Sequence, residues 1–184
     1  MNETIRSILD RRSNRGFSDQ PLDSDIIDTL KQCALASPTA VNLQSWHFTF
    51  VTSKDIIGSI EKDTIDAFRA KADDATVSRI ASRNNSIFYG APLVVFVSSD
   101  DDSKWGHIDA GIAVENLAVA AQSLGLGSVI IGLCGAAFAG DNAVKNAKLL
   151  DFPEKHSFSI AIAIGHPTVT KDAHPIAPGK ISEL

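Results

Sequence analysis

The sequence predicts an α+β sandwich built around one sheet, in a single domain that covers residues 1–184. Short runs of aliphatic, β-branched and aromatic residues, typical of strands, occur between longer segments whose apolar residues recur at helical spacing. A chain of 184 residues fits one domain, and it contains no internal repeat, low-complexity tract or linker that would divide it. Hydrophobic residues make up 44% and charged residues 21%, which is enough apolar material for a core.

Helical spacing identifies five segments. The one that follows Pro21 starts at Asp23 or Ser24, either of which is a suitable cap, and Pro38 prevents it from running on. Residues 73–90 are polar and show no clear period, so the sequence predicts no element there. The expected helices lie around residues 5–9, from 24 to before 38, and at 54–72, 105–124 and 136–150.

Four apolar runs predict strands. Residues 92–97 form a continuous apolar run, which is typical of a strand buried on both faces. The run at 47–52 combines aromatic with β-branched residues and alternates in part. The other two expected strands lie at 128–132 and 157–164.

The segment 105–124 predicts the central helix. Small residues crowd it, and apolar side chains occupy nearly all of its surface, a composition typical of a buried helix. Because small residues let a neighbouring backbone approach closely, this helix is a candidate for packing against a second copy of itself. Gly125 is placed to end it, since helix C-termini favour glycine.

Charge and cysteine content exclude several partners and compartments. The formal net charge of −5 argues against nucleic acid or an anionic membrane as the main partner. Cys33 and Cys134 lie far apart and form neither a redox motif nor a metal site, which suits a reducing compartment. The first residues do not resemble a signal peptide, and no apolar stretch is long enough to span a bilayer. We therefore expect a cytoplasmic protein without a membrane partner.

The sequence contains no evident side-chain catalyst. Gly125 and Gly127 begin a dinucleotide-type fingerprint, but Ile130 stands where its third glycine belongs. The five histidines show no metal-ligand spacing, so we expect no metal site, and no serine or cysteine has the sequence context of a nucleophile. A polar pocket without a side-chain catalyst is expected in a protein whose chemistry is carried by a bound cofactor.

Two polar segments supply groups suited to such a cofactor. Arg11, Arg12 and Arg15 offer planar forks of donors that match phosphate and carbonyl oxygens, and Ser13 adds a hydroxyl. The loop 37–46 carries amide side chains, which can both donate to and accept from the edge of a heteroaromatic ring. The alternative is a solvated basic turn followed by an ordinary surface loop, because clustered charge usually marks a solvated face.

Four motifs in order resemble the flavin-dependent nitroreductase family. They are Arg-Arg-Ser-Asn-Arg-Gly-Phe at 11–17, Ser-Pro-Thr-Ala-Val-Asn-Leu-Gln-Ser-Trp at 37–46, the segment 109–127, and Gly-His-Pro at 165–167. The resemblance covers about residues 6–181. The family usually has proline where Ser45 stands, a difference that loosens the loop without removing a donor.

This resemblance implies a three-layer sandwich in which helices flank a central, mostly antiparallel sheet. It also implies a homodimer in which the tail, residues 168–184, crosses the partner chain. The implied function is an FMN-dependent oxidoreductase that passes hydride from NADH or NADPH to a nitroaromatic, quinone or enal by a ping-pong mechanism. Two alternatives stay open: a flavin carrier or sensor without turnover, and a structural dimer whose arginines bind another phosphate.

The resemblance also assigns roles to individual residues. Arg11 and Ser13 match positions that hold the flavin phosphate, with Arg12 beside them, and Lys180 completes that site. Arg15 matches a basic residue near the flavin N1 and C2 carbonyl, where its charge favours the reduced, anionic ring. The remaining positions expected to contact the flavin are Ser37, Pro38, Thr39, Asn42, Gln44, either Asn84 or Asn85, Gly132 and Leu133.

Overall fold

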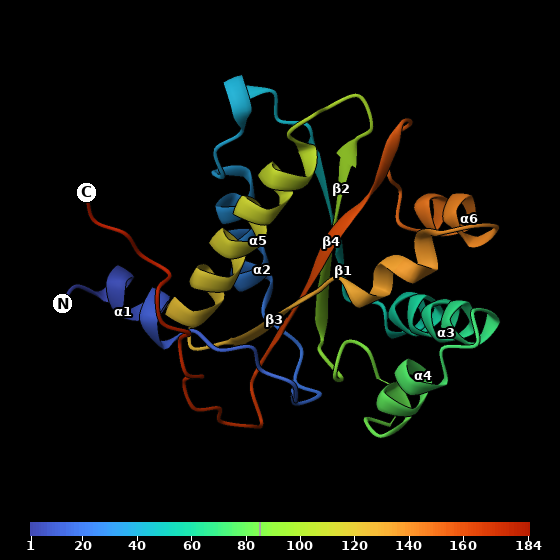
Figure 1. Cartoon of the computed structure of the whole chain (residues 1–184), viewed down its shortest axis with the longest axis horizontal. Helices are drawn as coiled ribbons and strands as arrows, with labels where there is room; N and C mark the ends of the chain where they lie inside the picture. The colour runs from blue at the N-terminus through green and yellow to red at the C-terminus, as the bar shows by residue number, and fades with distance from the viewer. Residues whose placement is uncertain (85) are drawn as a thin grey trace.

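The computed structural model describes residues 1–84 and 86–184, which form a sheet with helices on both faces (Figure 1). The α-helices are α1 (Glu3–Asp10), α2 (Ser24–Leu35), α3 (Lys54–Ala70), α4 (Asp74–Ala81), α5 (Gly106–Ser123) and α6 (Asn142–Leu149). Two short 3-10 helices are η1 (Ala40–Asn42) and η2 (Leu133–Phe138). The strands are β1 (Trp46–Val51), β2 (Leu93–Asp100), β3 (Gly127–Ile131) and β4 (His156–Gly165). Among the described residues, no helix has both the length and the apolar composition that crossing a bilayer requires.

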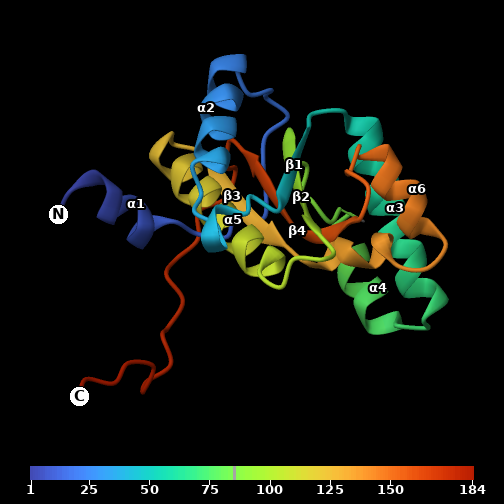
Figure 2. The same ribbon diagram turned by 90° about the horizontal axis from the view of Figure 1, so that it is seen from above.

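The four strands lie in the order β1-β2-β4-β3, and every neighbouring pair is antiparallel. Helices α2 and α5 cover one face of this sheet, while α3, α6 and η2 cover the other, with α4 beside α3 (Figure 2). Each helical layer packs its own apolar cluster against the sheet. The predicted three-layer α+β sandwich is therefore confirmed.

Strand β2 explains why the sheet needs both layers. Its residues from Leu93 to Val97 have no exposed surface, as the continuous apolar run predicts. Side chains alternate along a strand, so Val94 and Phe96 belong to the core on the α3 side, and Val95 belongs to the core on the α5 side. A strand covered on both faces has no polar alternation, which is why the run is apolar throughout.

Helix α5 is central to its layer but is not buried on all sides. Ala113 and Leu117 pack under the sheet with no exposed surface, as the small-residue pattern predicts. Ile108 and Ile112 are 56% and 38% exposed, so the prediction of burial nearly all round is wrong for a single chain. The helix ends where expected, because Gly125 adopts a φ of 73° that favours glycine.

Two other segments differ from the sequence prediction. Residues 73–90, which show no clear period, contain α4, a helix of 8 residues that is too short to display one. Asp73 caps it by accepting a hydrogen bond from the Thr76 N–H (3.0 Å). The single helix expected over 136–150 is divided into η2 and α6, since Gly140 between them has a φ of 60° and cannot continue a helix.

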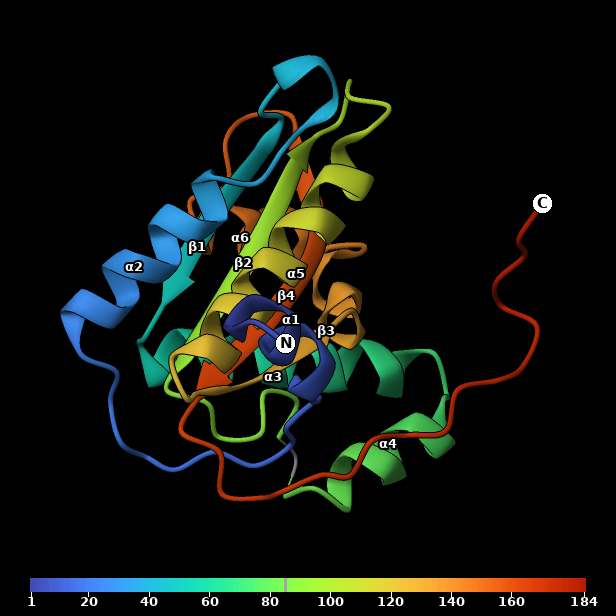
Figure 3. The same cartoon turned by 90° about the vertical axis from the view of Figure 1, so that its left-hand side faces the viewer.

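The chain after α1 runs beside the start of β3 and the end of β4. Ser13 forms a bridge with Ser128, and Phe17 forms one with Pro167. The backbone N–H of the buried Asn14 donates to the Ser128 carbonyl (2.9 Å), which fixes the arginine cluster against the sheet. From Pro167 onward every residue is exposed, and the tail leaves the sheet and ends clear of the rest of the chain (Figure 3).

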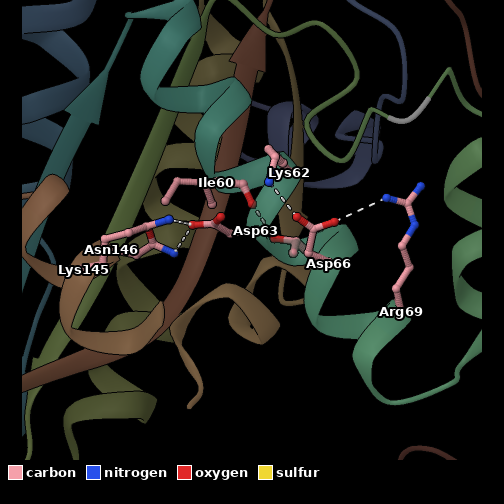
Figure 4. Close-up of polar contacts among 8 residues, drawn as sticks. Ile60, Lys62, Asp63, Asp66, Arg69, Lys145 and Asn146 are labelled. Carbon is pink, nitrogen blue, oxygen red and sulfur yellow. Dashed lines mark hydrogen bonds and ion pairs between the residues drawn. The ribbon is translucent and has the colours of Figure 1, made fainter. Parts of the chain in front are cut away.

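A polar cluster around the buried Asp63 and Asn146 ties η2 to α3 and α6 (Figure 4). Asp63, which is 6% exposed, forms an ion pair with Lys145 and accepts a hydrogen bond from the Asn146 amide (2.9 Å). The same amide nitrogen donates to the Ala137 carbonyl near the end of η2 (2.8 Å). Because η2 starts directly after Gly132, this cluster supports the turn between β3 and η2 from behind.

Two glycines give a matched test of backbone conformation. Gly58 lies inside α3 and Gly125 lies just past α5, and a Cβ at either position would meet no neighbouring atom within 4 Å. Gly58→Ala should raise the free energy of unfolding by about 0.5–1 kcal/mol, because alanine loses less backbone entropy in a helix. Gly125→Ala should lower it by roughly 1–2 kcal/mol, because an L-residue is strained in the left-handed region. Urea unfolding of both variants checks the two signs, and a shift in the same direction would contradict this account.

Candidate cofactor site

Arg15 and the turn after β3 line one hollow, as the resemblance implies. The hollow has a volume of about 270 Å³ and lies between β3 and α4. Its lining includes Arg15, Gly132 and Leu133, three positions at which flavin contact is expected. Its other wall carries Arg79 of α4 and Arg83, which follows that helix.

A second hollow, of about 480 Å³, adjoins the first, since Arg15, Arg83 and Tyr89 line both. Asn84 also lines it, in a backbone conformation with a φ of 54°. Of the two asparagines that the sequence leaves open, Asn84 therefore shares a hollow with Arg15. Asn85 lies outside the described residues.

One carboxylate oxygen of Glu61 in α3 holds the segment that leads from these hollows into β2. Its Oε1 accepts hydrogen bonds from the Ser86 hydroxyl (3.0 Å) and from the backbone N–H groups of Ile87 (2.7 Å) and Phe88 (2.9 Å). Charge-assisted bonds of this kind are among the stronger ones in proteins. They fix residues 86–88, directly before Tyr89.

Arg11 carries a buried donor that has no hydrogen-bond partner among the described residues. Its Nε lies 3.5 Å from a carboxylate oxygen of Glu115 in α5, which is ion-pair distance, but the geometry gives no hydrogen bond. A buried N–H without an acceptor costs free energy, so this position fits an incoming anion such as a phosphate.

Arg12 and the other two phosphate candidates have different surroundings. Arg12 donates from one nitrogen to the carbonyls of Leu9 (2.7 Å) and Arg11 (2.8 Å), which satisfies the end of α1. Ser13 is half-buried and held by its bridge to β3. Lys180 belongs to the exposed tail and lines neither hollow, so the structure does not bring it to Arg15.

The loop from α2 to β1 is held in a strained conformation. Val41, Asn42 and Gln44 have positive φ angles of 46°, 58° and 50°. Thr39 accepts a hydrogen bond at its hydroxyl from the Gln44 N–H (3.0 Å), and the Gln44 side chain donates to the Asn42 side chain (3.1 Å). Such strain is costly and concentrates at functional positions, so it supports a role for this loop.

The same loop is anchored to α5, on either side of Pro38. Asn116 donates to the Ser37 hydroxyl (3.0 Å), and the buried Asp109 carboxylate accepts from the Ala40 N–H (3.2 Å). These bonds place η1 beside the first turns of α5, at the top of Figure 1, whereas β3 follows the other end of that helix. Neither arginine-lined hollow includes a loop residue. Within one chain, the loop and Arg15 therefore do not meet.

Cys134 lies in η2 beside the first hollow but is not a nucleophile. Burial raises the pKa of its thiol, so the side chain stays protonated. Its Sγ donates to the Ile131 carbonyl (3.6 Å). Cys134 therefore acts as a small buried hydrophobe, whereas Cys33 is half-buried.

The sequence prediction missed the α4 side of the site. Four residues line or support the hollows and lie outside the four motifs described above: Glu61, Arg79, Arg83 and Tyr89. The available signal was a pair of arginines four residues apart, although α4 carries only Arg79 and Arg83 lies just past its end. The pair could be assigned to the site only after α4 had been located in the structure.

The fold and the hollows together define a class of protein. An antiparallel sheet between two helical layers presents a backbone turn, an arginine beside it and a second arginine whose buried Nε makes no hydrogen bond. This arrangement suits a ligand that has both a ring and an anionic group. The chain belongs to the nitroreductase family, whose model matches residues 8–166, so the predicted family and fold class are confirmed.

Relatives support the same assignment. The chain is 29% identical to the "FMN reductase [NAD(P)H]" of Bacillus subtilis, over 97% of this chain and 71% of that protein. It is 27% identical to a "Putative NADH dehydrogenase/NAD(P)H nitroreductase" of Archaeoglobus fulgidus, over 94% of this chain and 90% of that protein.

Solved structures of nitroreductases have the same fold as this chain. The chain superimposes on a nitroreductase with bound FMN from Desulfitobacterium hafniense with a TM-score of 0.94 and 31% identity, over 100% of this chain and 99% of that one. A nitroreductase with bound FMN from Bacteroides fragilis gives a TM-score of 0.89 and 26% identity, with 100% of both chains covered.

Proposed function

We propose that this protein is an FMN-dependent oxidoreductase that passes hydride from NADH or NADPH to a small electron-poor acceptor such as a nitroaromatic, quinone or enal. The observation that carries the proposal is the hollow in which Arg15 faces the Gly132–Leu133 turn, in a chain of this family. The expectations of an NAD(P)H-dependent flavin oxidoreductase and of FMN are confirmed by the named FMN reductase and by the two FMN-bound structures. The acceptor class and the ping-pong mechanism are our inference.

The residues present fit FMN, and each has a separate task. Arg11, whose Nε lacks an acceptor, binds the phosphate together with Ser13. Arg15 would place a positive charge beside the ring, and the Gly132–Leu133 turn in the same hollow would contact the ring through its backbone. Bound FMN supplies the hydride chemistry, so the protein needs to orient and to exclude water rather than to abstract a proton.

A homodimer follows from the separation of the two groups of site residues. The strained loop 37–44 is bonded to α5 and contributes no residue to the lining of the Arg15 hollow, so a second copy is needed to bring a loop to each hollow. Ile108 and Ile112 give α5 an exposed apolar face on which that copy would pack. We propose that residues 1–184 are one domain and that the tail 168–184 crosses the partner and delivers Lys180.

Anaerobic titration tests the function. Purified protein should be yellow with about one FMN per chain, and NADH or NADPH should bleach that colour before any acceptor is added. Steady-state rates with a quinone should give parallel double-reciprocal lines. Protein that binds no flavin after reconstitution would contradict the proposal, and bound flavin that neither nucleotide reduces would identify a carrier or sensor instead.

Arg15→Gln tests the charge beside the ring. The substitution keeps a donor and removes the charge, so the two-electron potential should fall by tens of millivolts, where 30 mV is about 1.4 kcal/mol. FMN should stay bound, because Arg11 and Ser13 remain. Spectroelectrochemical titration measures the potential, and an unchanged potential with loss of FMN would reassign Arg15 to the phosphate.

A further inference from the structure

The flavin contacts proposed above use Arg15 and the Gly132–Leu133 turn but neither arginine on the α4 side of the hollow. Arg79 and Arg83 are four residues apart and line the 270 Å³ hollow together with Gly132 and Leu133. Among the ion pairs of the described residues, none involves Arg79, Arg83 or Arg15. Three guanidiniums thus line one hollow without a paired carboxylate.

Local contacts orient the guanidiniums of Arg79 and Arg83 and leave most of their N–H donors available. Arg83 donates to the Tyr89 hydroxyl (2.8 Å), and its guanidinium carbon lies 5.7 Å from the centre of that ring. Arg79 donates to the Thr76 hydroxyl (3.4 Å). A guanidinium has five N–H donors, so each of these bonds leaves a fork that can bind an oxyanion.

Nearby acids do not neutralise this group. Hydrogen bonding from Thr76, with a smaller effect of Arg79, lowers the pKa of Asp73, so this carboxylate is ionised, but it is committed to capping α4. Glu61 is likewise committed to the segment before β2. Taken together, the two hollows are lined by three arginines and no acid, on a chain with a net charge of −5.

We propose that Arg79 and Arg83 bind an oxyanion, a phosphate or a carboxylate, carried by the substrate that enters the hollow beside the flavin. Ile87, Val129 and Ile131 on the same walls would contact the substrate's apolar ring. The inference rests on the proposed function, since it takes the Gly132–Leu133 turn to mark the flavin. The oxyanion has two sources, a phosphate of the nicotinamide nucleotide or a carboxylate of the acceptor, and the test separates them.

The nucleotide arm measures equilibrium binding of NADP⁺ and NAD⁺ to the oxidised, FMN-loaded protein by calorimetry. Arg79→Gln and Arg83→Gln should each weaken NADP⁺ binding roughly tenfold, the usual effect of losing a charge-assisted hydrogen bond. Unchanged NAD⁺ binding would assign the contact to the 2′-phosphate, and an equal loss would assign it to the pyrophosphate. Lys71→Gln is the control, because it removes the same charge just before α4 from a residue that lines neither hollow.

The acceptor arm compares 4-nitrobenzoate with 4-nitrobenzamide, which has a similar shape and no charge. The KM for the benzoate should rise roughly tenfold in the two arginine variants while that for the benzamide stays constant, if the acceptor supplies the oxyanion. Arg79→Lys keeps the charge and loses the fork, so it should recover part of the affinity. Tyr89→Phe tests whether Arg83 needs its hydroxyl partner, and thermal unfolding confirms that the variants fold.

Two results would overturn the inference. In the first, all four ligands bind the arginine variants no differently from Lys71→Gln. In the second, the arginine variants release FMN, which would make these residues cofactor ligands. Either result leaves the proposed function standing if the parent protein holds FMN and is bleached by a nicotinamide, whereas a parent without flavin would remove the function itself.

Discussion

Ile108→Glu combined with Ile112→Glu should convert the protein from a dimer to a monomer and release its FMN. Both side chains lie on α5 and are exposed in one chain, and in the proposed dimer a second copy covers them. Burying the exposed part of each isoleucine contributes about 1 kcal/mol, and a two-fold interface contains each residue twice. The glutamates add the cost of burying charge. The dissociation constant of the dimer should therefore rise by at least roughly a thousandfold.

Loss of FMN should accompany loss of the dimer, because one chain does not bring the loop 37–44 to Arg15. Analytical ultracentrifugation at micromolar concentration, with absorbance read at the flavin band, follows both properties in one experiment. Val144→Glu is the matched control, since it makes the same apolar-to-charged change at a side chain of α6 that is 79% exposed and lies on the other side of the sheet. A double variant that stays dimeric, or a folded monomer that keeps its flavin, would contradict the proposed assembly.

The layers of the fold could be predicted from sequence because their signals are local. The apolar run at 92–97 predicts β2 within three residues at its end, and Gly125 marks the end of α5. The eight residues of α4 could not be predicted, since so short a helix on the surface shows no period. The exposure of Ile108 could not be predicted either. An isoleucine in the sequence does not indicate whether its own chain or a partner would cover it.

The candidate site was predictable in part for a similar reason. Motif positions such as Arg15 and Gly132 can be assigned by resemblance, and the structure brings these two to one hollow. The role of Arg79 and Arg83 depends on the hollow that separates α4 from β3, which no local pattern encodes. Sequence also gives no indication that Gln44, although expected at the same ring, lies apart from Arg15 within one chain.

Arg11→Ala should weaken FMN binding by about 1.5–3 kcal/mol, which corresponds to roughly a 10- to 150-fold rise in the dissociation constant. The guanidinium Nε is buried without an acceptor, and its side chain is 26% exposed, so a phosphate there would gain a well-shielded charged bond. Removing Arg11 also leaves Glu115 unpaired close to the phosphate position, which adds repulsion. Fluorescence quenching of FMN added to the apoprotein measures the constant.

Arg12→Ala is the matched control for that change. It removes the same charge from the neighbouring position, but its guanidinium is bound to the Leu9 and Arg11 carbonyls at the end of α1. We expect about 1 kcal/mol less stability and little change in FMN affinity, because a cap is lost rather than a ligand contact. The double variant Arg11→Ala with Glu115→Gln should recover the part of the loss that comes from repulsion. If Arg12→Ala releases FMN and Arg11→Ala does not, the two arginines exchange roles and the buried Nε of Arg11 serves only its ion pair with α5.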